Sequence, residues 1–284
     1  MKAFFYTSFA LLCFAFNSIL CRLALGTGEI DAAGFAAVRL VSGAVTLLII
    51  SLFFSKNETG KIGGNWLSAF FLFAYAICFS FAYLDLTTAT GALILFGAVQ
   101  LTMVSAALLK GERPFFLEWS GLFCAFGGLV YLVFPGLTAP PLLSSLLMLA
   151  AGISWGFYTL RGRGSSSKKG EKPLAATTGN FLRCVPLVIF ITLLFLPNIY
   201  LSQKGILLAV LSGAIASGVG YAVWYAALKY HTATRAAILQ LSVPALAALG
   251  GIIFLAEIIS TRLLLASGLI LGGIGLAVFG KRKN

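Results

Sequence analysis

Ten long apolar segments determine what this chain of 284 residues can fold into. Each runs for about 20 residues with few charges, the length that a helix needs to cross the hydrocarbon core of a bilayer. The hydrocarbon core holds no water, so the backbone N–H and C=O groups of a spanning segment must bond to each other. A single apolar segment meets this requirement only as an α-helix. The sequence therefore predicts an all-α integral membrane protein with ten transmembrane helices, at residues 4–25, 35–54, 66–85, 88–109, 115–134, 142–161, 176–197, 205–228, 233–255 and 261–280.

The composition is typical of an integral membrane protein and argues against a nucleic-acid-binding protein. Hydrophobic residues make up 60% of the chain and charged residues 10%, whereas ordinary globular domains carry about 25% charge. The formal net charge is +12, but the basic residues stand between the apolar segments and form no continuous stripe of the kind that binds nucleic acid. We expect the lipid bilayer as a partner, and no nucleic acid.

Lysine and arginine in short loops orient the chain, because they concentrate on the cytoplasmic side of a membrane. With the N-terminus inside, fifteen basic residues fall on the cytoplasmic side and only Arg22, Lys204 and Arg262 on the other. The remaining two, Arg39 and Arg183, lie inside expected helices. The sequence thus predicts a multi-pass protein whose N- and C-termini are both cytoplasmic.

The chain repeats itself at a nearly constant interval. TATGALILFGA at 88–98 returns as TATRAAILQLS at 232–242, which is 144 residues later. Glu112 and Glu257 follow these two segments and lie 145 residues apart. Duplication at a fixed interval indicates that one structural unit is present twice.

The duplicated unit has five expected helices, so the two copies enter the membrane from opposite faces. FAAVRL at 35–40 matches GNFLRC at 179–184, in the same register as the other matches. The sequence predicts one five-helix repeat at 1–135 and a second at 140–284. Inverted repeats are typical of secondary transporters, whose substrate site lies near the membrane midplane between the halves.

Four short motifs occur in an order that supports a resemblance to a known family. They are Asn-Ser in the first segment (17–18), F-x-x-x-R in the second (35–39), Glu-Arg after the fourth (112–113) and SWGFYTL in the sixth (154–160). With ten helices arranged as five plus five, the chain resembles the drug/metabolite transporter superfamily, in its EamA-type branch. The resemblance implies a carrier of the bacterial inner membrane, often an exporter of amino acids or related small metabolites. It also implies a cavity lined largely by helices 1, 3, 4, 6, 8 and 9.

Arg39 and Arg183 are the charged residues that most suggest a transport pathway. An ionised side chain at the centre of a membrane helix costs about 2.5 to 3.5 kcal/mol, so such residues usually face a bundle interior or a wet cavity. One interpretation is structural: the arginines reach helix ends or lipid phosphate, and Arg39 could extend to the interface. The other is that a guanidinium attracts a carboxylate or phosphate on its way through.

Uncharged polar and aromatic side chains complete the set of candidate pathway residues. The amides can bind substrate or join neighbouring helices, and the aromatic residues can wall an apolar pocket or simply pack. These candidates are Asn17, Gln100, Gln240, Tyr75, Tyr83, Trp155, Tyr158, Tyr221 and Trp224.

Several functions are not expected. No HExxH motif, paired-carboxylate motif, P-loop or Cys/His cluster occurs, so we predict neither an enzyme nor a metal or cofactor site. We predict a secondary transporter of a small molecule, which works by alternating access and exports amino acids or related metabolites. The alternatives are an uptake carrier or exchanger for another small organic solute, and a membrane enzyme acting on lipid-linked substrates. The sequence leaves the oligomeric state open.

Overall fold

The computed structural model is helical almost throughout the part of the chain that it describes. That part comprises residues 2–54, 63–109, 116–133, 139–168, 172–231, 236, 239–240 and 242–279. In chain order the helices are α1 (Lys2–Gly26), α2 (Ala32–Phe54), α3 (Trp66–Ala82), α4 (Thr88–Leu109), α5 (Phe116–Val133), α6 (Leu142–Lys168), α7 (Pro173–Leu194), the 3₁₀ turn η1 (Leu196–Asn198), α8 (Gln203–Leu211), the π-helix η2 (Ser212–Val219), α9 (Gly220–Leu228), α11 (Ser242–Leu255) and α12 (Thr261–Phe279).

Length and composition allow many of these helices to cross a membrane. Six helical segments are long and apolar enough to cross a membrane. One of them, Gln203–Leu228, is continuous through α8, η2 and α9. Four shorter apolar helices accompany them, at Trp66–Ala82, Trp119–Leu132, Ser242–Leu255 and Thr261–Gly273. The chain is thus an all-helical, multi-pass membrane protein, while the count of ten crossings stays a prediction.

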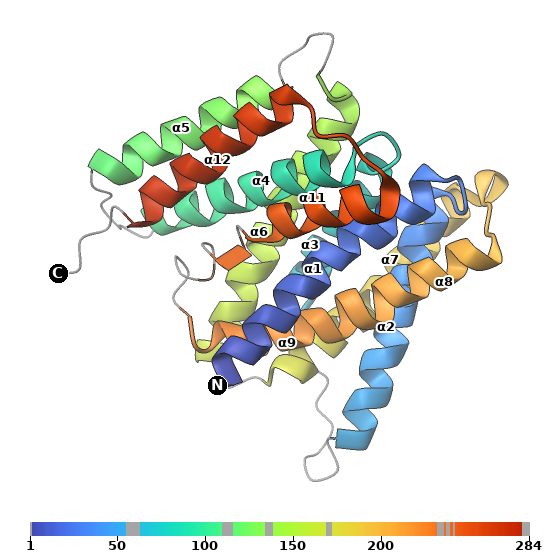
Figure 1. Cartoon of the computed structure of the whole chain (residues 1–284). Helices are drawn as coiled ribbons and strands as arrows, with labels where there is room; N and C mark the ends of the chain where they lie inside the picture. The colour runs from blue at the N-terminus through green and yellow to red at the C-terminus, as the bar shows by residue number, and fades with distance from the viewer. Residues whose placement is uncertain are drawn as a thin grey trace.

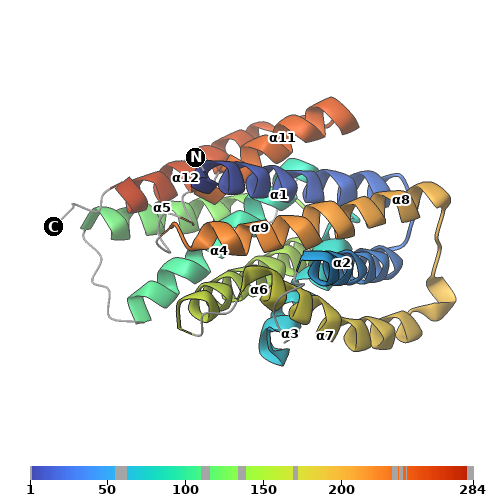
Figure 2. The same ribbon diagram turned by 90° about the horizontal axis from the view of Figure 1, so that it is seen from below.

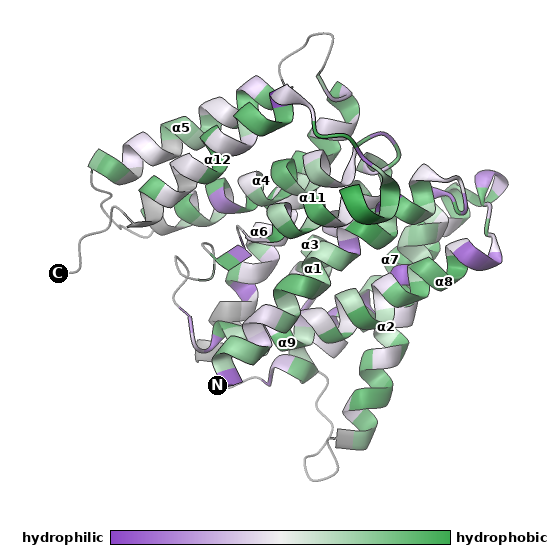
Figure 3. Ribbon diagram, in the orientation of Figure 1, coloured by the Kyte–Doolittle hydropathy of each residue, from purple (hydrophilic) through white to green (hydrophobic). Residues whose placement is uncertain are grey.

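The α2 helix illustrates how a lipid-facing helix differs from a soluble one. Val41, Val45 and Ile49 are exposed and lie four residues apart, so they form one apolar stripe on the outer face. Apolar exposure of this kind recurs over the other helices, and Figure 3 shows the hydrophobic colour on nearly every turn. Such a surface is suited to acyl chains and unsuited to water.

Helices α5 and α12 pack mainly on each other at one edge of the bundle (Figures 1 and 2). A Cβ atom on Gly128 would come within 2.8 Å of Leu269 Cβ, and one on Gly273 would come within 2.6 Å of the backbone of Gly121 and Ala125. These glycines therefore let the two helices approach closely, as small residues do in membrane bundles.

The other helices form the body of the bundle. Helix α1 packs against η2, α9 and α11, while α6 packs against α3 and α4. Helix α2 lies against α7 and η2. Helices from the two expected halves are therefore interleaved, and the buried core runs through both.

One predicted helix end was wrong. The sixth helix was expected at 142–161, ending where the stretch RGRGSSSKKGEKP (161–173) begins, yet α6 continues to Lys168 and α7 begins at Pro173. Glycine and serine lower helix propensity by only about 0.5 to 1 kcal/mol each, whereas proline is tolerated in the first helical turn. The first strong stop after residue 161 is thus Pro173.

The connections before α2 and before α8 lie side by side. Ile30 and Leu201 form an isolated antiparallel bridge. Ser202 N donates to Glu29 O at 2.9 Å, and the Glu29 carboxylate accepts hydrogen bonds from Ser202 Oγ at 2.7 Å and Lys204 Nζ at 3.0 Å. These contacts join the two halves of the chain at one end of the bundle.

The Glu29 contacts predict a small pH dependence of stability. Hydrogen bonds from Ser202 and Lys204 lower the pKa of Glu29 below its ordinary value. A lowered folded-state pKa adds stability above the unfolded pKa, about 4.3, and this stability is lost as the pH falls through the folded value. The unfolding temperature of Glu29→Gln should therefore be lower than that of wild type at about pH 7, and the difference should disappear at acidic pH. A deficit that is the same at every pH would contradict the assignment.

Candidate functional site

Arg39 lies inside the bundle and not at its surface. It is the eighth residue of α2 (Ala32–Phe54), about 10 Å along the helix from its first residue at 1.5 Å per residue. Its exposed fraction is 1%. The interpretation that Arg39 extends to the membrane interface was therefore wrong, because the side chain leaves α2 on the face that packs against α3 and η2.

The guanidinium of Arg39 is held by hydroxyl groups. Nε donates to Ser217 Oγ at 2.9 Å, and Nη2 donates to Tyr75 Oη at 3.0 Å and to Tyr221 Oη at 2.7 Å. The guanidinium carbon also lies 5.1 Å from the ring centre of Tyr75 and 4.9 Å from that of Phe79. These partners come from α3, η2 and α9, so the arginine joins both halves of the chain.

The buried charge of Arg39 has no acidic partner in the part of the chain that the structure describes. Nη1 has no hydrogen-bond partner there, and the ion pairs found among those residues involve Arg22 and Lys204. An arginine stays protonated in proteins, and removing its charge from water costs several kcal/mol. The central site is therefore cationic.

Asn17 and Ser212 extend the network toward α1. Asn17 Nδ2 donates to Tyr75 Oη at 3.0 Å and to Tyr221 Oη at 3.1 Å, and Ser212 Oγ donates to Asn17 Oδ1 at 2.5 Å. Tyr221 Oη in turn donates to Tyr75 Oη at 3.1 Å. The following set is called the central cluster: Asn17, Arg39, Tyr75, Ser212, Ser217 and Tyr221.

Sequence reasoning missed the two serines of the central cluster. Ser212 and Ser217 lie on the π-helix η2, within the segment SGAIASGV. A π-helix changes the register of the residues that follow it, and such elements are frequent at functional sites. The available signal was a pair of serines in a glycine-rich stretch of an otherwise apolar helix. Composition alone does not show whether such serines serve a functional site or only helix packing.

Gly213 lets η2 reach α2. A Cβ atom on Gly213 would collide with the carbonyl oxygen of Arg39 and with Ser42 Oγ. Gly43 lies opposite on α2, where a Cβ atom would come within 2.9 Å of the carbonyl oxygen of Gly213. Both helices therefore need glycine at this contact.

Gly213→Ala should displace η2 from α2 and destabilise the protein. Overpacking of a tight contact costs about 1 to 3 kcal/mol, so thermal unfolding in detergent should occur at a lower temperature. Gly268→Ala on α12 is the matched control, because an added Cβ atom there meets nothing within 4 Å. The control should be neutral or more stable by up to about 1 kcal/mol. Equal unfolding temperatures for both variants would contradict the close contact.

Aromatic rings surround the central cluster. The ring centre of Trp155 lies 4.6 Å from that of Tyr221 and 5.0 Å from that of Tyr75. Phe14 contacts Trp155 at 5.3 Å and Trp224 at 5.4 Å. The rings come from α1, α3, α6 and α9, and they form an apolar wall beside the buried guanidinium.

Other predicted pathway residues lie next to the aromatic wall, outside the central cluster. Trp155 Nε1 donates to Gln240 Oε1 at 3.1 Å, and the ring of Tyr158 lies 5.5 Å from that of Trp155. Gln100 is buried on α4. Most of the predicted pathway residues therefore converge on one region of the bundle.

Arg183 and Tyr83 lie elsewhere. Arg183 Nη1 donates to the carbonyl oxygens of Gly63 and Gly179, both at 2.8 Å, so this arginine ties α7 to the segment before α3. Tyr83 donates from Oη to the carbonyl oxygen of Thr88 at 3.3 Å. Neither residue contacts the central cluster directly.

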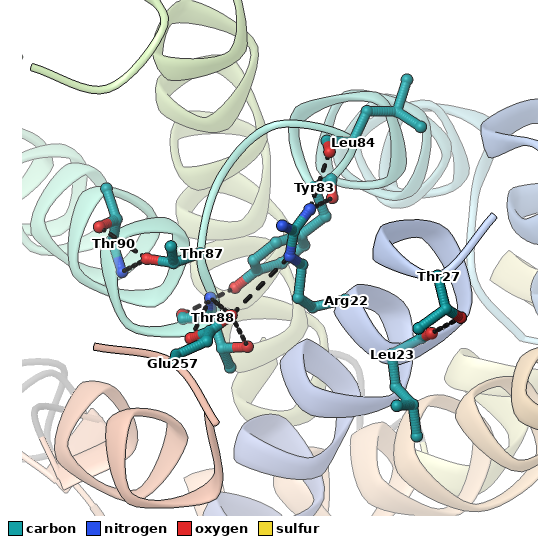
Figure 4. Close-up of polar contacts among 9 residues, drawn as sticks. All are labelled: Arg22, Leu23, Thr27, Tyr83, Leu84, Thr87, Thr88, Thr90 and Glu257. Atoms are coloured by element: carbon teal, nitrogen blue, oxygen red, sulfur yellow. Dashed lines mark hydrogen bonds and ion pairs between the residues drawn. The ribbon is translucent and has the colours of Figure 1, made fainter. Parts of the chain in front are cut away.

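A second polar network closes one end of the bundle (Figure 4). Arg22 Nη1 donates to the carbonyl oxygens of Tyr83 at 3.0 Å and Leu84 at 2.8 Å. Its Nε lies 3.8 Å from Glu257 Oε1. Glu257 also accepts from Thr88, whose backbone N lies 2.8 and 2.9 Å from the two carboxylate oxygens and whose Oγ1 lies 3.0 Å from Oε1. Arg22, Tyr83, Leu84, Thr88 and Glu257 are called the end cluster.

The end cluster uses the first turn of α4. Thr88 begins α4, and a carboxylate is stabilised at the positive end of a helix dipole. Ala256 adopts a positive φ of 53° just before Glu257, a conformation that is strained for alanine and needs support from surrounding contacts. The end cluster thus ties the end of α1 to α3, α4 and the residues after α11.

Phe79 connects the two clusters along one face of α3. Its ring centre lies 5.2 Å from that of Tyr75 in the central cluster and 4.7 Å from that of Tyr83 in the end cluster. Tyr75, Phe79 and Tyr83 are spaced four residues apart, which places them on one face of the helix. Packed aromatic rings therefore join the end cluster to the central cluster.

The site offers binding chemistry. It combines a fixed positive charge, hydroxyl and amide groups that donate and accept hydrogen bonds, and an aromatic wall. Among the described residues there is no group of three or more His, Cys, Asp or Glu residues able to hold a metal ion.

Comparison with known proteins agrees with this architecture. The model of the EamA-like transporter family matches residues 142–279. An uncharacterized protein of Pseudomonas aeruginosa is 48% identical over 270 residues, which cover 95% of this chain and 92% of the relative. An uncharacterized transporter of Archaeoglobus fulgidus is 28% identical over 78% of both chains. A crystal structure with 19% identity superposes over 99% of both chains with a TM-score of 0.69, which shows a shared fold.

The family model and the relatives named transporters show that this multi-pass helical bundle is a membrane transporter. More specifically, the chain belongs to the EamA-like transporter family of the drug/metabolite transporter superfamily.

Proposed function

We propose that this transporter is a secondary carrier of the bacterial inner membrane that exports amino acids or related small metabolites by alternating access. Two inverted five-helix halves, 1–135 and 140–284, move against each other around the central cluster. The observation that carries the proposal is the buried Arg39 with its partners from both halves, Tyr75 and Ser217 among them.

The packing pattern supports inverted halves. If the halves are equivalent, α6 corresponds to α1, α9 to α3 and α11 to α4. Helix α3 packs on α6 as α9 packs on α1, and α4 packs on α6 as α11 packs on α1. The counterparts α2 and α7 pack on each other, as do α5 and α12. This is the pairing expected if a two-fold axis relates the halves, and an odd number of crossings in each half would place that axis in the membrane plane.

The orientation of the chain gives the end cluster a role. If basic loops are cytoplasmic, the ends of α1 and α3 and the start of α4 face outward. The end cluster then seals the outer side, with Arg22 and Glu257 as its charged members. Its sequence counterpart, Glu112, lies outside the described residues.

Site-directed labelling tests the orientation. Thr27 lies in the exposed connection after α1. A cysteine introduced there by Thr27→Cys should react with a membrane-impermeant maleimide added to intact cells. A cysteine at position 165 should react only after the cells are permeabilised. The reverse pattern would overturn the proposed topology, and with it the outward position of the end cluster.

Metabolite comparison tests the proposed activity. Cells that overproduce the wild-type protein should accumulate one class of small metabolite in the medium relative to cells without it. Gly213→Ala cells, with matched amounts of protein in the membrane, should accumulate less if the α2–η2 contact serves transport. Loss of the same class from the medium would instead indicate uptake. No change in any compound would count against export and be followed by exchange measurements in proteoliposomes.

A further inference from the structure

We propose that the free Nη1 edge of Arg39 binds the carboxylate of the transported solute, and that the aromatic wall beside it accepts an apolar remainder. The inference rests on the proposed transport function and names the chemical class of its substrate. It depends on three observations: the lack of an acidic partner, the direction from which Arg39 is already held, and the nature of the neighbouring side chains.

The first observation is a buried charge that no acidic residue in the described part of the chain neutralises. All eight acidic residues fall between the apolar segments or near their ends: Glu29, Asp31, Glu58, Asp85, Glu112, Glu118, Glu171 and Glu257. None of them lies in the middle of a helix that contributes to the central cluster. A buried charge normally has a partner of opposite sign, and among the described residues no acidic side chain supplies one to Arg39, which leaves this role to the solute.

The second observation is the arrangement of donors around Arg39. Nε and Nη2 are engaged by Ser217, Tyr75 and Tyr221, which fixes the plane of the guanidinium. Nη1 is left without a partner among the described residues although the side chain is 1% exposed. The Nη1 group of this fixed guanidinium still has N–H donors for a charge-assisted hydrogen bond to a carboxylate.

The third observation concerns what else the solute would meet. Phe79 faces the guanidinium, and Trp155 lies against both tyrosines of the central cluster. A site of this composition binds an apolar body and orients it by one charged contact. The guanidinium is enclosed in this structure, so the solute reaches it only when the helices separate, which is the movement that alternating access requires.

Arg183 supplies an internal comparison. It occupies the same position in the second repeat, yet its Nη1 is satisfied by two backbone carbonyls, those of Gly63 and Gly179. These bonds tie Arg183 to the segment before α3, whereas Arg39 is bound to hydroxyl groups beside the aromatic wall. The proposal therefore assigns carboxylate recognition to Arg39 and not to its sequence counterpart.

The test is ligand-dependent thermal stabilisation of the full-length protein in lipid nanodiscs. The probes are leucine, 4-methylpentanoate, leucinol and acetate in a chloride-free HEPES–Tris buffer, with sodium chloride as a further probe. Leucine and 4-methylpentanoate carry the carboxylate and an apolar body, leucinol lacks the carboxylate, and acetate lacks the body. Wild type is compared with Arg39→Gln and with the matched control Arg183→Gln.

We expect leucine and 4-methylpentanoate to raise the unfolding temperature of wild type and Arg183→Gln, and leucinol to have no effect. Arg39→Gln should bind the two carboxylates at least about tenfold more weakly, the loss typical of a bond to a charged group. Acetate should act only at higher concentration than 4-methylpentanoate.

Four results would overturn the proposal: equal shifts with leucinol, unchanged carboxylate binding by Arg39→Gln, stabilisation by chloride alone, and no shift with any probe. Because this assay measures binding, its outcome is separable from the metabolite comparison. Carboxylate binding through Arg39 without any transport would sink the proposed function and keep the site. Transport with a carboxylate preference that survives in Arg39→Gln would do the opposite.

Discussion

Replacing Arg39 by methionine should abolish transport without weakening the fold. The guanidinium is buried without an acidic partner, and apolar replacement of buried charged groups is often neutral or stabilising by about 1 to 4 kcal/mol. The two tyrosine hydroxyl groups that it leaves stay bonded, because Asn17 donates to both Tyr75 and Tyr221. Export should fall by about a hundredfold or more if Arg39 supplies the charged contact of the substrate in the transport cycle.

The pair of measurements separates a binding role from a structural one. Export of the accumulated metabolite is measured in cells with matched protein levels, and unfolding temperature is measured on the purified protein. Arg183→Met is the control: it loses two charged hydrogen bonds to backbone carbonyls and should be less stable by about 1.5 to 3 kcal/mol while still transporting. If Arg39→Met were the unstable variant, Arg39 would be a structural clamp and the charge argument would be wrong.

The positions of the helices could be predicted because lipid leaves the backbone few options. The segment expected at 88–109 is α4, Thr88–Leu109, and the one expected at 205–228 is Gln203–Leu228. Prediction failed at the end of α6, beyond the long apolar run. There no membrane constraint forces an ending, and glycine and serine do not by themselves stop a helix.

The candidate site could be predicted only in part. Asn17 and Arg39 were chosen as polar groups within membrane helices, and Tyr75 and Tyr221 as aromatic residues that could wall a pocket. The structure brings all four together. The same reasoning could not separate Arg39 from Arg183, because the repeats give them equivalent positions. They differ in their partners, since hydroxyl groups hold Arg39 and backbone carbonyls hold Arg183, and these tertiary contacts cannot be read from the matching sequence positions.

Neutralising Glu257 should open the end cluster and expose the buried Cys21 beside it. Glu257 accepts three hydrogen bonds from Thr88 and lies 3.8 Å from Arg22, so Glu257→Gln removes the charge that holds α4 against α1. Cys21 precedes Arg22 and is fully buried. In a protein whose other four cysteines are alanine, the opening should raise Cys21 labelling by an impermeant maleimide about tenfold to a hundredfold.

The control for this experiment is Glu29→Gln, at the connection between α1 and α2. Its carboxylate bonds to Ser202 and Lys204 near the surface and touches neither α4 nor the residues after α11, so labelling of Cys21 should stay at the wild-type rate. Faster labelling in Glu257→Gln alone would make the end cluster a gate whose strength depends on one charge at a helix N-terminus. If Cys21 reacted at the same rate in both variants, yet fully after denaturation, Glu257 would merely cap α4, and the closing contact of the transport cycle would have to lie elsewhere.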